Sequence, residues 1–389
     1  MSSSREKRVG FRNVIALGFV SFFTDVSTEM VLSLIPVFIV YELGASRGIL
    51  GIIEGLAESL SYALRLVSGV ISDKLRRRKA IIFLGYAISS IAKPLFFLAH
   101  TWIDALVIRV MDRIGKGIRT SPRDALLSES VKDRELGKAF GLHRSLDQAG
   151  AILGPFLSLV LLPLIGMRRI FLLSFIPAAL ALVILWAFVV EAVWRPKASV
   201  KVLRGARSLL RGKFLVLLGA VTIFYMGAFN YSFILVRAAE LGIPVALIPL
   251  VYMVINIMHT AIGLPAGFLA DRVGREVMLA LGYAFFSATS LSLILIRETP
   301  LYAFIAALMF GIYAGIVDTI QRALLPKYVP SDMRGTAYGI YYITIGFASL
   351  VGNSVVGYLW DVLSYRVAFA YSLLLSVIAI GAVLTSLKS

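Results

Sequence analysis

The chain has 389 residues, of which 59% are hydrophobic, and its formal net charge at pH 7 is +17. Its mean hydropathy of +0.87 exceeds that of a typical soluble domain, so the excess apolar surface is expected to face lipid. The sequence contains no cysteine, which excludes disulfides, cysteine-based zinc sites and thiol nucleophiles.

Apolar stretches long enough to cross a bilayer, about 20 residues each, follow one another along the chain. In the first half they are Asn13–Tyr41, Gly48–Ile71, Ala80–Ala99, Trp102–Ile118, Leu136–Leu162 and Ile170–Val190. In the second half they are Phe214–Val236, Val245–Leu269, Val277–Ile296, Leu301–Leu324, Gly335–Tyr358 and Val367–Leu387. We therefore predict an all-α membrane protein with twelve transmembrane helices in two six-helix bundles. The predicted domains are residues 1–190, a basic linker at 191–213, and residues 214–389.

Basic residues gather in the even-numbered loops between the predicted spans. The run Arg76–Lys79 follows the second span, and seven Lys and Arg residues lie within the linker 191–213. Because Lys and Arg near helix ends resist translocation, we predict a multi-pass protein of the cell (inner) membrane with both termini cytoplasmic. The linker is expected to be a solvated segment that sets this topology, and docking of anionic lipid is the alternative.

A repeat with an offset of 198 residues relates the two halves. Gly69 and Asp73 recur as Gly267 and Asp271, and the same offset maps Gly154 onto Gly352. Short matches in one register indicate a duplicated six-helix unit. Such a duplication predicts a binding site near the midplane between two bundles and transport by alternating access.

Ionisable residues occur inside several predicted spans, where each is expensive to insert and needs a partner or water. Asp25 and Glu29 are four residues apart on the first span and so share one helical face. The candidates for proton or substrate binding are Asp25, Glu29, Glu58, Arg109, Asp112, Arg113, Arg144 and Asp147. Counting about 1.5 Å per residue from the helix ends places four of these at a similar depth, where we expect one network of Asp25, Glu58, Arg109 and Asp147.

Two interpretations of this network stay open. In the first, the charges are inter-helix ion pairs that hold the N-terminal bundle together. In the second, a carboxylate whose charged form is disfavoured by burial exchanges a proton and trades its arginine partner for substrate or water. Asp25 and Glu29 are the first candidates for that role. Lys93, the charge of the third span, is expected near the outer interface, where its side chain reaches water.

The second half is poorer in charge and richer in tyrosine. An aromatic wall for an amphipathic or ring-containing solute is expected from Tyr225, Tyr231, Tyr313, Tyr338, Tyr341 and Tyr342. For each of these residues, packing or anchoring at the bilayer surface is the alternative.

The segment Gly69–Lys79, echoed at Gly267–Arg275, resembles the loop signature of the major facilitator superfamily. Gly69 lets helices approach closely, and Asp73 can accept hydrogen bonds from a helix N-terminus. The resemblance implies that Asp73 pins the neighbouring half near Gly335 while the cytoplasmic side is closed.

The predicted fifth span contains Gly150, Gly154 and Pro155, which resemble the glycine-proline signature of the drug:proton antiporters of this family. That pattern usually continues with glycine, whereas this chain has Ser158 at the corresponding place. On the fourth span, Arg109 matches the family's mid-membrane arginine, and the run Asp112–Asp124 resembles a prokaryotic subgroup. The expected gating residues are Gly69, Asp73, Arg76, Gly150, Gly154, Pro155, Gly267 and Asp271.

The predicted function is secondary active transport by alternating access, with proton-coupled efflux of a lipophilic or amphipathic small molecule through antiport. The alternative is transport of an organic anion, metabolite or lysolipid held by intramembrane arginines, namely Arg109, Arg113 and Arg144. An enzyme is not expected, because no nucleophile–base pair or metal cluster occurs at a recognisable spacing. We expect a monomer without cofactor or nucleic-acid partner, which interacts with its small-molecule substrate, protons and the lipid bilayer.

Overall fold

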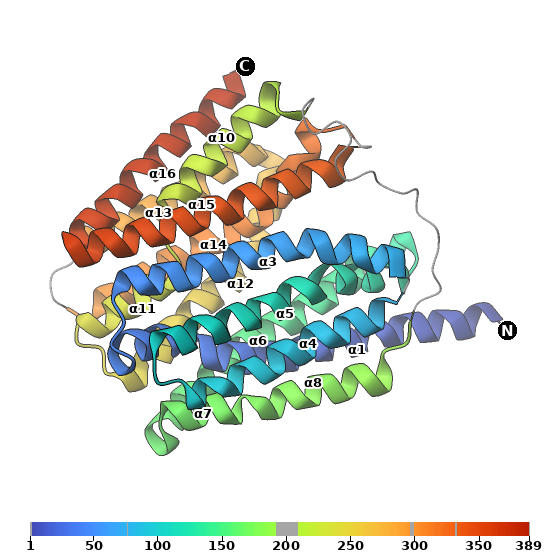
Figure 1. Cartoon of the computed structure of the whole chain (residues 1–389). Helices are drawn as coiled ribbons and strands as arrows, with labels where there is room; N and C mark the ends of the chain where they lie inside the picture. Colours follow the sequence, from blue (N-terminus) through green and yellow to red (C-terminus); the bar gives the residue numbers. More distant parts are fainter. Residues whose placement is uncertain (1, 76, 192–208, 296–298, 331–332, 389) are drawn as a thin grey trace. The chain divides into compact units, whose positions relative to one another are not determined.

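A computed structural model describes residues 2–75, 77–191, 209–295, 299–330 and 333–388 of the chain. Helices follow one another along this described part, and none of it forms a β-strand (Figure 1). Ten of its helical stretches are long and apolar enough to cross a membrane. The predicted all-α membrane fold is thereby confirmed.

Contacts divide the chain into two compact units, residues 1–35 with 60–198 and residues 36–59 with 199–389. The first unit contains α1 (Ser2–Leu32), the second part of α3 (Arg47–Leu75), α4 (Arg78–Ala92), η2 (Lys93–Leu98), α5 (Trp102–Glu129), η3 (Asp133–Glu135), α6 (Leu136–Ile165), α7 (Met167–Leu173) and α8 (Phe175–Phe188). Residues 192–208 of the predicted linker 191–213 lie outside the described residues, and the predicted domain boundaries stay a prediction.

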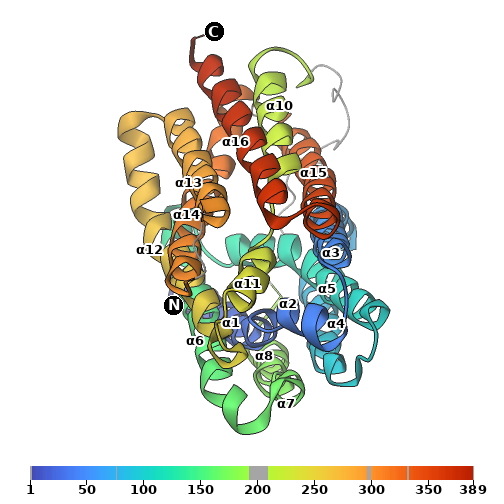
Figure 2. The ribbon, with the colours of Figure 1, turned by 90° about the vertical axis from the view of Figure 1, so that its left-hand side faces the viewer.

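The second unit contains the first part of α3 and most of the C-terminal half. Its other elements are α2 (Ile35–Val37), η1 (Phe38–Glu42), α10 (Gly212–Gly227), α11 (Tyr231–Glu240), η4 (Val245–Leu247), α12 (Ile248–Val273), α13 (Arg275–Leu295), α14 (Leu301–Tyr328), α15 (Arg334–Val362) and α16 (Tyr365–Lys388). Helices α10, α15 and α16 lie side by side, and α12 and α13 both pack on α14 (Figure 2).

Two long helices, α3 and α5, are not among the ten apolar stretches. The helix α5 has 28 residues, enough to cross a bilayer, but it carries both Arg109 and Asp112 in its interior. The helix α3 has 29 residues and includes Glu54 and Glu58. The predicted count of twelve transmembrane helices therefore stays a prediction.

A core of apolar side chains holds α1 against α4 and α8. Val14, Leu17, Ile82 and Leu185 are fully buried in this cluster. Inside a membrane such side chains hold the helices together by van der Waals packing, because lipid tails are as apolar as the side chains. This core fixes one face of α1, and the polar side chains of α1 described below lie on another.

The predicted seventh span is interrupted between α10 and α11. Asn230 caps α11 with its side chain, and its backbone N–H donates to Asn353 Oδ1 at 2.8 Å. The hydroxyl of Tyr371 donates to the Met226 carbonyl at 2.8 Å. Because freed backbone groups need partners inside a membrane, these bonds allow the helix to break at this point.

The internal repeat extends to individual bonds. The hydroxyl of Ser121 donates to the Arg65 carbonyl at 2.7 Å, and the hydroxyl of Thr319, 198 residues later, donates to the Gly263 carbonyl at 3.2 Å. Likewise, an ion pair of Arg78 and Glu129 recurs as one of Glu276 and Lys327 with the charges exchanged. At these two pairs of equivalent positions the contact is therefore the same in both units, although the side chains that make it differ.

Candidate functional site

Asp147 lies at the centre of a polar cluster between α1 and α6. The hydroxyl of Ser21 donates to Asp147 Oδ1 at 2.6 Å, and Arg144 Nη1 donates to Asp147 Oδ2 at 3.0 Å. The carboxyl groups of Asp25 and Asp147 face each other closely enough to interact. The structure therefore brings three of the predicted candidates together.

Small residues of α6 make this approach possible. A Cβ atom on Gly150 would lie 2.4 Å from the Phe22 carbonyl oxygen, and one on Gly154 would lie 2.7 Å from the Val26 carbonyl oxygen. Ser158, one turn further on, donates to the Met30 carbonyl at 2.9 Å. The backbones of α1 and α6 are thus in contact along this line.

The same line of contact sets the positions of the α1 carboxylates. The Cβ of Asp25 faces Gly150 and that of Glu29 faces Gly154, as their shared spacing of four residues requires. Pro155 lies inside α6 and is buried. The glycines of the predicted gating signature therefore place both carboxylates at the α1–α6 interface.

A hydrogen bond between two carboxyl groups requires a proton on one of them, because ionised carboxylates are only acceptors. Two ionised carboxylates at such a distance would also repel each other. The pair of Asp25 and Asp147 is therefore a candidate site for a shared proton. Ser21 and Arg144 stabilise the partner that stays ionised.

A second cluster surrounds Asp112 of α5. Arg109 Nη1 lies 3.4 Å from Asp112 Oδ2, Arg113 Nε lies 3.3 Å from the same oxygen, and Ser89 of α4 donates to Asp112 Oδ1 at 2.5 Å. Arg109, Asp112 and Arg113 are at most 4% exposed. Asp112 is thus the counter-ion of two buried arginines.

The four residues expected in one network have the following contacts, and their joining into a single network stays a prediction. Asp25 contacts Asp147, Arg109 contacts Asp112, and Glu58 belongs to the second unit. The depth of a residue in the membrane can be estimated from its distance to the helix end in the sequence. The neighbour that it faces depends on how the helices pack.

The expectation that Lys93 reaches water was wrong. Its side chain is 2% exposed, and Nζ donates to Thr28 Oγ1 of α1 at 3.1 Å. Asp112 attracts this ammonium group from α5. Arg119, buried against the ring of Tyr86 with Cζ 4.5 Å from its centroid, was also missed, although it follows Asp112 by seven residues and so shares its helical face.

Asp73, the predicted gating carboxylate of the first repeat, is 68% exposed and pairs with Arg78 Nη2 at 2.9 Å. Arg78 also donates to both carboxylate oxygens of Glu129, at 2.8 and 2.7 Å. Gly69 lies opposite Ser121 of α5, whose Cβ would be 3.4 Å from a Cβ at the glycine. The predicted gating residue Arg76 lies outside the described residues.

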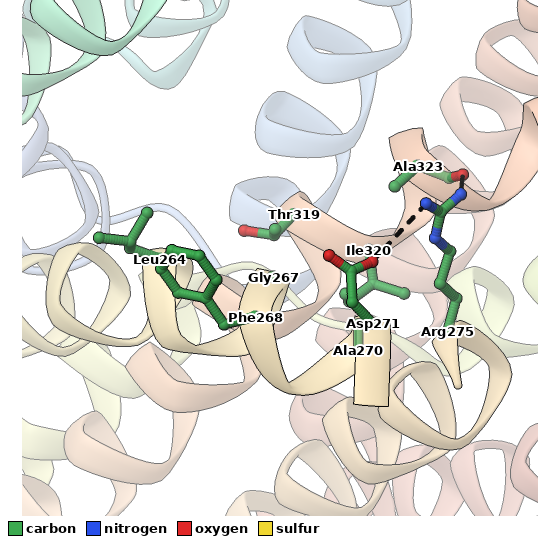
Figure 3. A pocket seen from close by; sticks show the side chains of 9 residues that line it. All are labelled: Leu264, Gly267, Phe268, Ala270, Asp271, Arg275, Thr319, Ile320 and Ala323. Carbon is green, nitrogen blue, oxygen red and sulfur yellow. Dashed lines mark hydrogen bonds and ion pairs between the residues drawn. The ribbon is translucent and has the colours of Figure 1, made fainter. Parts of the chain in front are cut away.

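The second copy of the signature lines a surface pocket of about 290 Å³ between α12 and α14 (Figure 3). Gly267 and Asp271 come from α12, and Thr319 and Ala323 face them from α14. Arg275 Nη1 donates to the Ala323 carbonyl at 2.6 Å and Nη2 lies 3.8 Å from Asp271 Oδ1. The arginine therefore joins the start of α13 to α14 beside the pocket.

The start of α3 is bound to the end of α15 within the second unit. Asp361 accepts hydrogen bonds from the backbone N–H groups of Arg47 at 3.0 Å and Gly48 at 2.7 Å. The side chain of Arg47 contacts Glu240 at 2.7 Å, which Arg237 also contacts at 3.0 Å. A carboxylate at a helix N-terminus is favoured by the free N–H groups there. Sequence analysis did not identify Asp361.

The tyrosines of the second unit lie among other aromatic rings, and Phe224 contacts both Tyr225 and Tyr313. Tyr225 donates to Gln321 Oε1 at 3.1 Å, whereas Tyr313 packs edge-on against Phe286. Tyr338 and Tyr342 stack with their ring centroids 6.1 Å apart. The same unit brings His259 Nε2 to 3.7 Å from Asp318 Oδ2.

The sequence matches the Major Facilitator Superfamily over residues 17–343 and again over residues 215–388. An uncharacterised MFS-type transporter of Methanocaldococcus jannaschii is 35% identical over 382 residues, covering 95% of this chain and 93% of the relative. The multi-drug resistance efflux pump PmrA of Streptococcus pneumoniae is 25% identical over 363 residues, covering 87% of this chain and 88% of the pump.

Solved structures of transporters share the fold. A mutant of the nucleoside transporter NupG superimposes with a TM-score of 0.83 at 12% identity, over 96% of this chain and 99% of NupG. A bacterial homologue of the human lysosomal transporter Spinster superimposes with a TM-score of 0.71 at 15% identity, over 97% and 95% of the two chains.

Proposed function

The chain belongs to the Major Facilitator Superfamily, and on that premise we propose that it is a proton-coupled transporter that exports a lipophilic or amphipathic small molecule by alternating access. Membership of the family makes it a multi-pass membrane transporter. The coupling ion, the direction of transport and the solute are the proposed parts.

The observation that carries the proposal is the close approach of the Asp25 and Asp147 carboxyl groups at the α1–α6 contact, where Ser21 of α1 donates to Asp147. One proton is held between α1 and α6, and the two helices are in backbone contact at Gly150 and Gly154. A movement of α1 relative to α6 therefore separates the carboxyl groups. The separated pair favours ionisation of both, which releases the proton.

Export is supported by the similarity to the efflux pump PmrA and by the Gly150–Pro155 segment of α6. An amphipathic solute fits the tyrosines of the second unit, such as Tyr225 and Tyr342, whose rings have an apolar face and a polar tip. We also propose that both termini are cytoplasmic in the cell membrane, as the distribution of Lys and Arg predicts.

The gating roles of Gly69, Asp73, Gly267 and Asp271 are part of the same proposal. Asp73 and Asp271 are both strongly exposed, at 68% and 71%. Each therefore remains available to accept hydrogen bonds from another helix end when the transporter changes conformation.

The proposal is tested with the purified protein in liposomes loaded with a fluorescent amphipathic dye. An imposed pH gradient should drive dye movement in the wild-type protein and should fail to drive it in Asp25→Asn and Asp147→Asn, because an amide cannot exchange a proton in this range. Glu135→Gln serves as the control, since Glu135 makes no side-chain cap bond at the start of α6. Undiminished gradient-driven transport in both Asp variants would contradict the proton role.

A further inference from the structure

Helices α4 and α5 of the first unit meet backbone to backbone. A Cβ atom on Gly115 would lie 2.6 Å from the Gly85 carbonyl oxygen, and one on Gly85 would lie 2.7 Å from the Gly115 carbonyl oxygen. The long side chains on either side of this contact are consequently held between the helices. They form a buried cluster of unusual charge, described next.

The cluster contains more positive than negative charge. Its cations, each at most 5% exposed, are Lys93, Arg109, Arg113 and Arg119. Asp112 is buried with them, and Asp25 interacts electrostatically with Lys93 and Arg119. Lys93 also interacts electrostatically with Asp112, Arg113 and Arg119, so the groups face a common region. Four cations against these two carboxylates leave a formal excess of two positive charges there.

Several donors of the cluster lack a hydrogen-bond partner. They are Arg113 Nη2, Arg119 Nη1, the hydroxyl of Tyr86 and the hydroxyl of Ser90. Guanidinium nitrogens can only donate, and hydroxyls can donate as well. Buried polar groups without partners are rare in proteins. Unpaired donors together with excess positive charge are what an anionic oxygen acceptor requires.

We propose that Lys93, Arg113 and Arg119, with the hydroxyls of Tyr86 and Ser90, bind the anionic group of the transported solute. The solute is then an amphipathic anion whose carboxylate or phosphate is held by these side chains of α4, η2 and α5. This inference rests on the proposed transport function and specifies the chemistry of its substrate. Of these five residues, Arg113 alone was a candidate on sequence grounds.

Two partly exposed charged residues lie beside the cluster, Asp25 of α1 and Lys116 of α5. Asp25 interacts electrostatically with Lys116, with Lys93 and with Arg119.

The test is ligand-dependent thermal stabilisation of the full-length protein in neutral detergent, since a ligand of the folded state raises its melting temperature. The probes are decanoate and inorganic phosphate as anions, and decyltrimethylammonium as a cation with the same chain. We expect the anions to stabilise the protein and the cation not to. Arg119→Lys should weaken decanoate binding about tenfold, because an ammonium group loses the paired donors of guanidinium. Arg366→Gln, at an exposed arginine of the second unit, should leave it unchanged.

If Arg119→Lys does not fold, Tyr86→Phe combined with Ser90→Ala keeps every charge and should still weaken decanoate binding severalfold. Stabilisation by the cation alone, or anion binding that both sets of variants leave unchanged, would overturn the inference. Stabilisation by phosphatidylglycerol in nanodiscs, without any effect of free anions, would assign the cluster to a lipid headgroup and overturn it as well. None of these binding measurements uses a pH gradient. If the protein binds anions here but shows no gradient-driven transport in liposomes, the result would contradict the proton role and leave the anion site standing.

Discussion

At the scale of single residues, the buried charges of the first unit are held by a small number of contacts. Asp112 accepts from Ser89 and faces two arginines, while Asp147 accepts from Ser21 and Arg144. We expect the loss of Asp112 to have other consequences than the loss of Asp147. Asp147 has a carboxyl partner that can take over the remaining charge, whereas Asp112 has none of comparable burial in the described part of its unit.

Asp112→Asn is therefore expected to destabilise the protein. Removing one partner of a buried ion pair leaves an uncompensated charge, which costs about 3–5 kcal/mol, and here Arg109 and Arg113 both lose their counter-ion. The free energy of unfolding in mixed micelles measures the effect. The control is Asp73→Asn, whose side chain is 68% exposed and whose loss should change stability by less than about 1 kcal/mol. Equal effects of the two substitutions would contradict this description of Asp112.

Sequence analysis singled out several charged residues inside the predicted spans but not the partners that they contact. Asp25, Arg109, Asp112 and Asp147 stand out because charge inside an apolar stretch is expensive. Which of them meet is decided by helix packing, and residues as far apart as Asp25 and Asp147 carry no local signal of contact. Lys93 was misjudged because its place near a span end suggested an interface, whereas Thr28 and Asp112 draw it inward.

At the scale of elements, the packing of α1 on α6 depends on glycine at two positions. A methyl group at Gly150 would lie 2.4 Å from the Phe22 carbonyl oxygen, so Gly150→Ala should force the helices apart and lower stability by about 1–3 kcal/mol. Gly141 of the same helix has nothing within 4 Å of its Cβ position. Gly141→Ala should therefore be neutral or stabilise by up to about 1 kcal/mol. The melting temperatures of the two variants measure these effects. A similar loss of stability in both would contradict the close contact of α1 and α6 at Gly150.

The reversed ion pairs of the repeat suggest a charge exchange. Arg78 and Glu129 occupy the positions that Glu276 and Lys327 occupy in the second unit. Arg78→Glu alone should destabilise the first unit, because it places carboxylates against each other. The double variant Arg78→Glu with Glu129→Lys should recover part of that loss, with a coupling energy of about 1–3 kcal/mol in a double-mutant cycle. Strictly additive effects would show that the pair does not contribute through its charges.

Element boundaries were predicted well where hydropathy changes sharply, as at Leu301 and Leu136, the starts of α14 and α6. Breaks inside an apolar span were not predicted. The interruption between α10 and α11 depends on Asn353 and Tyr371, which are distant in sequence from Asn230 and Met226 and satisfy the freed backbone groups. A hydropathy pattern has no means of indicating such partners.

At the scale of the whole molecule, α3 is the helix that both units share. Its first part, up to Ser59, belongs to the second unit, and its remainder belongs to the first. Asp361 binds the two N–H groups at its start, while Ser68 near its other end donates to the Gly117 carbonyl at 3.0 Å. A conformational change that detaches α3 from α15 must therefore break the bonds to Asp361.

Asp361→Ala is expected to make this detachment easier. The chain has no cysteine, so a single cysteine at Ser354, whose Cα would be 3.3 Å from a Cβ at Gly51, reports whether α3 covers α15. Its reaction with a maleimide should be slow with Asp361 present and several times faster in the Asp361→Ala background. An unchanged rate, or a change that Glu42→Gln at the end of η1 reproduces, would contradict the role of Asp361.

The shared proton of Asp25 and Asp147 is tested most directly by infrared spectroscopy of the purified protein at neutral pH, which detects the C=O stretch of a protonated carboxyl group without any substrate. We predict such a band in the wild-type protein, its downshift in D₂O, and its loss in Asp25→Asn and in Asp147→Asn but not in Glu135→Gln. A wild-type spectrum without the band, or a band that survives both Asp substitutions, would contradict proton storage at this pair.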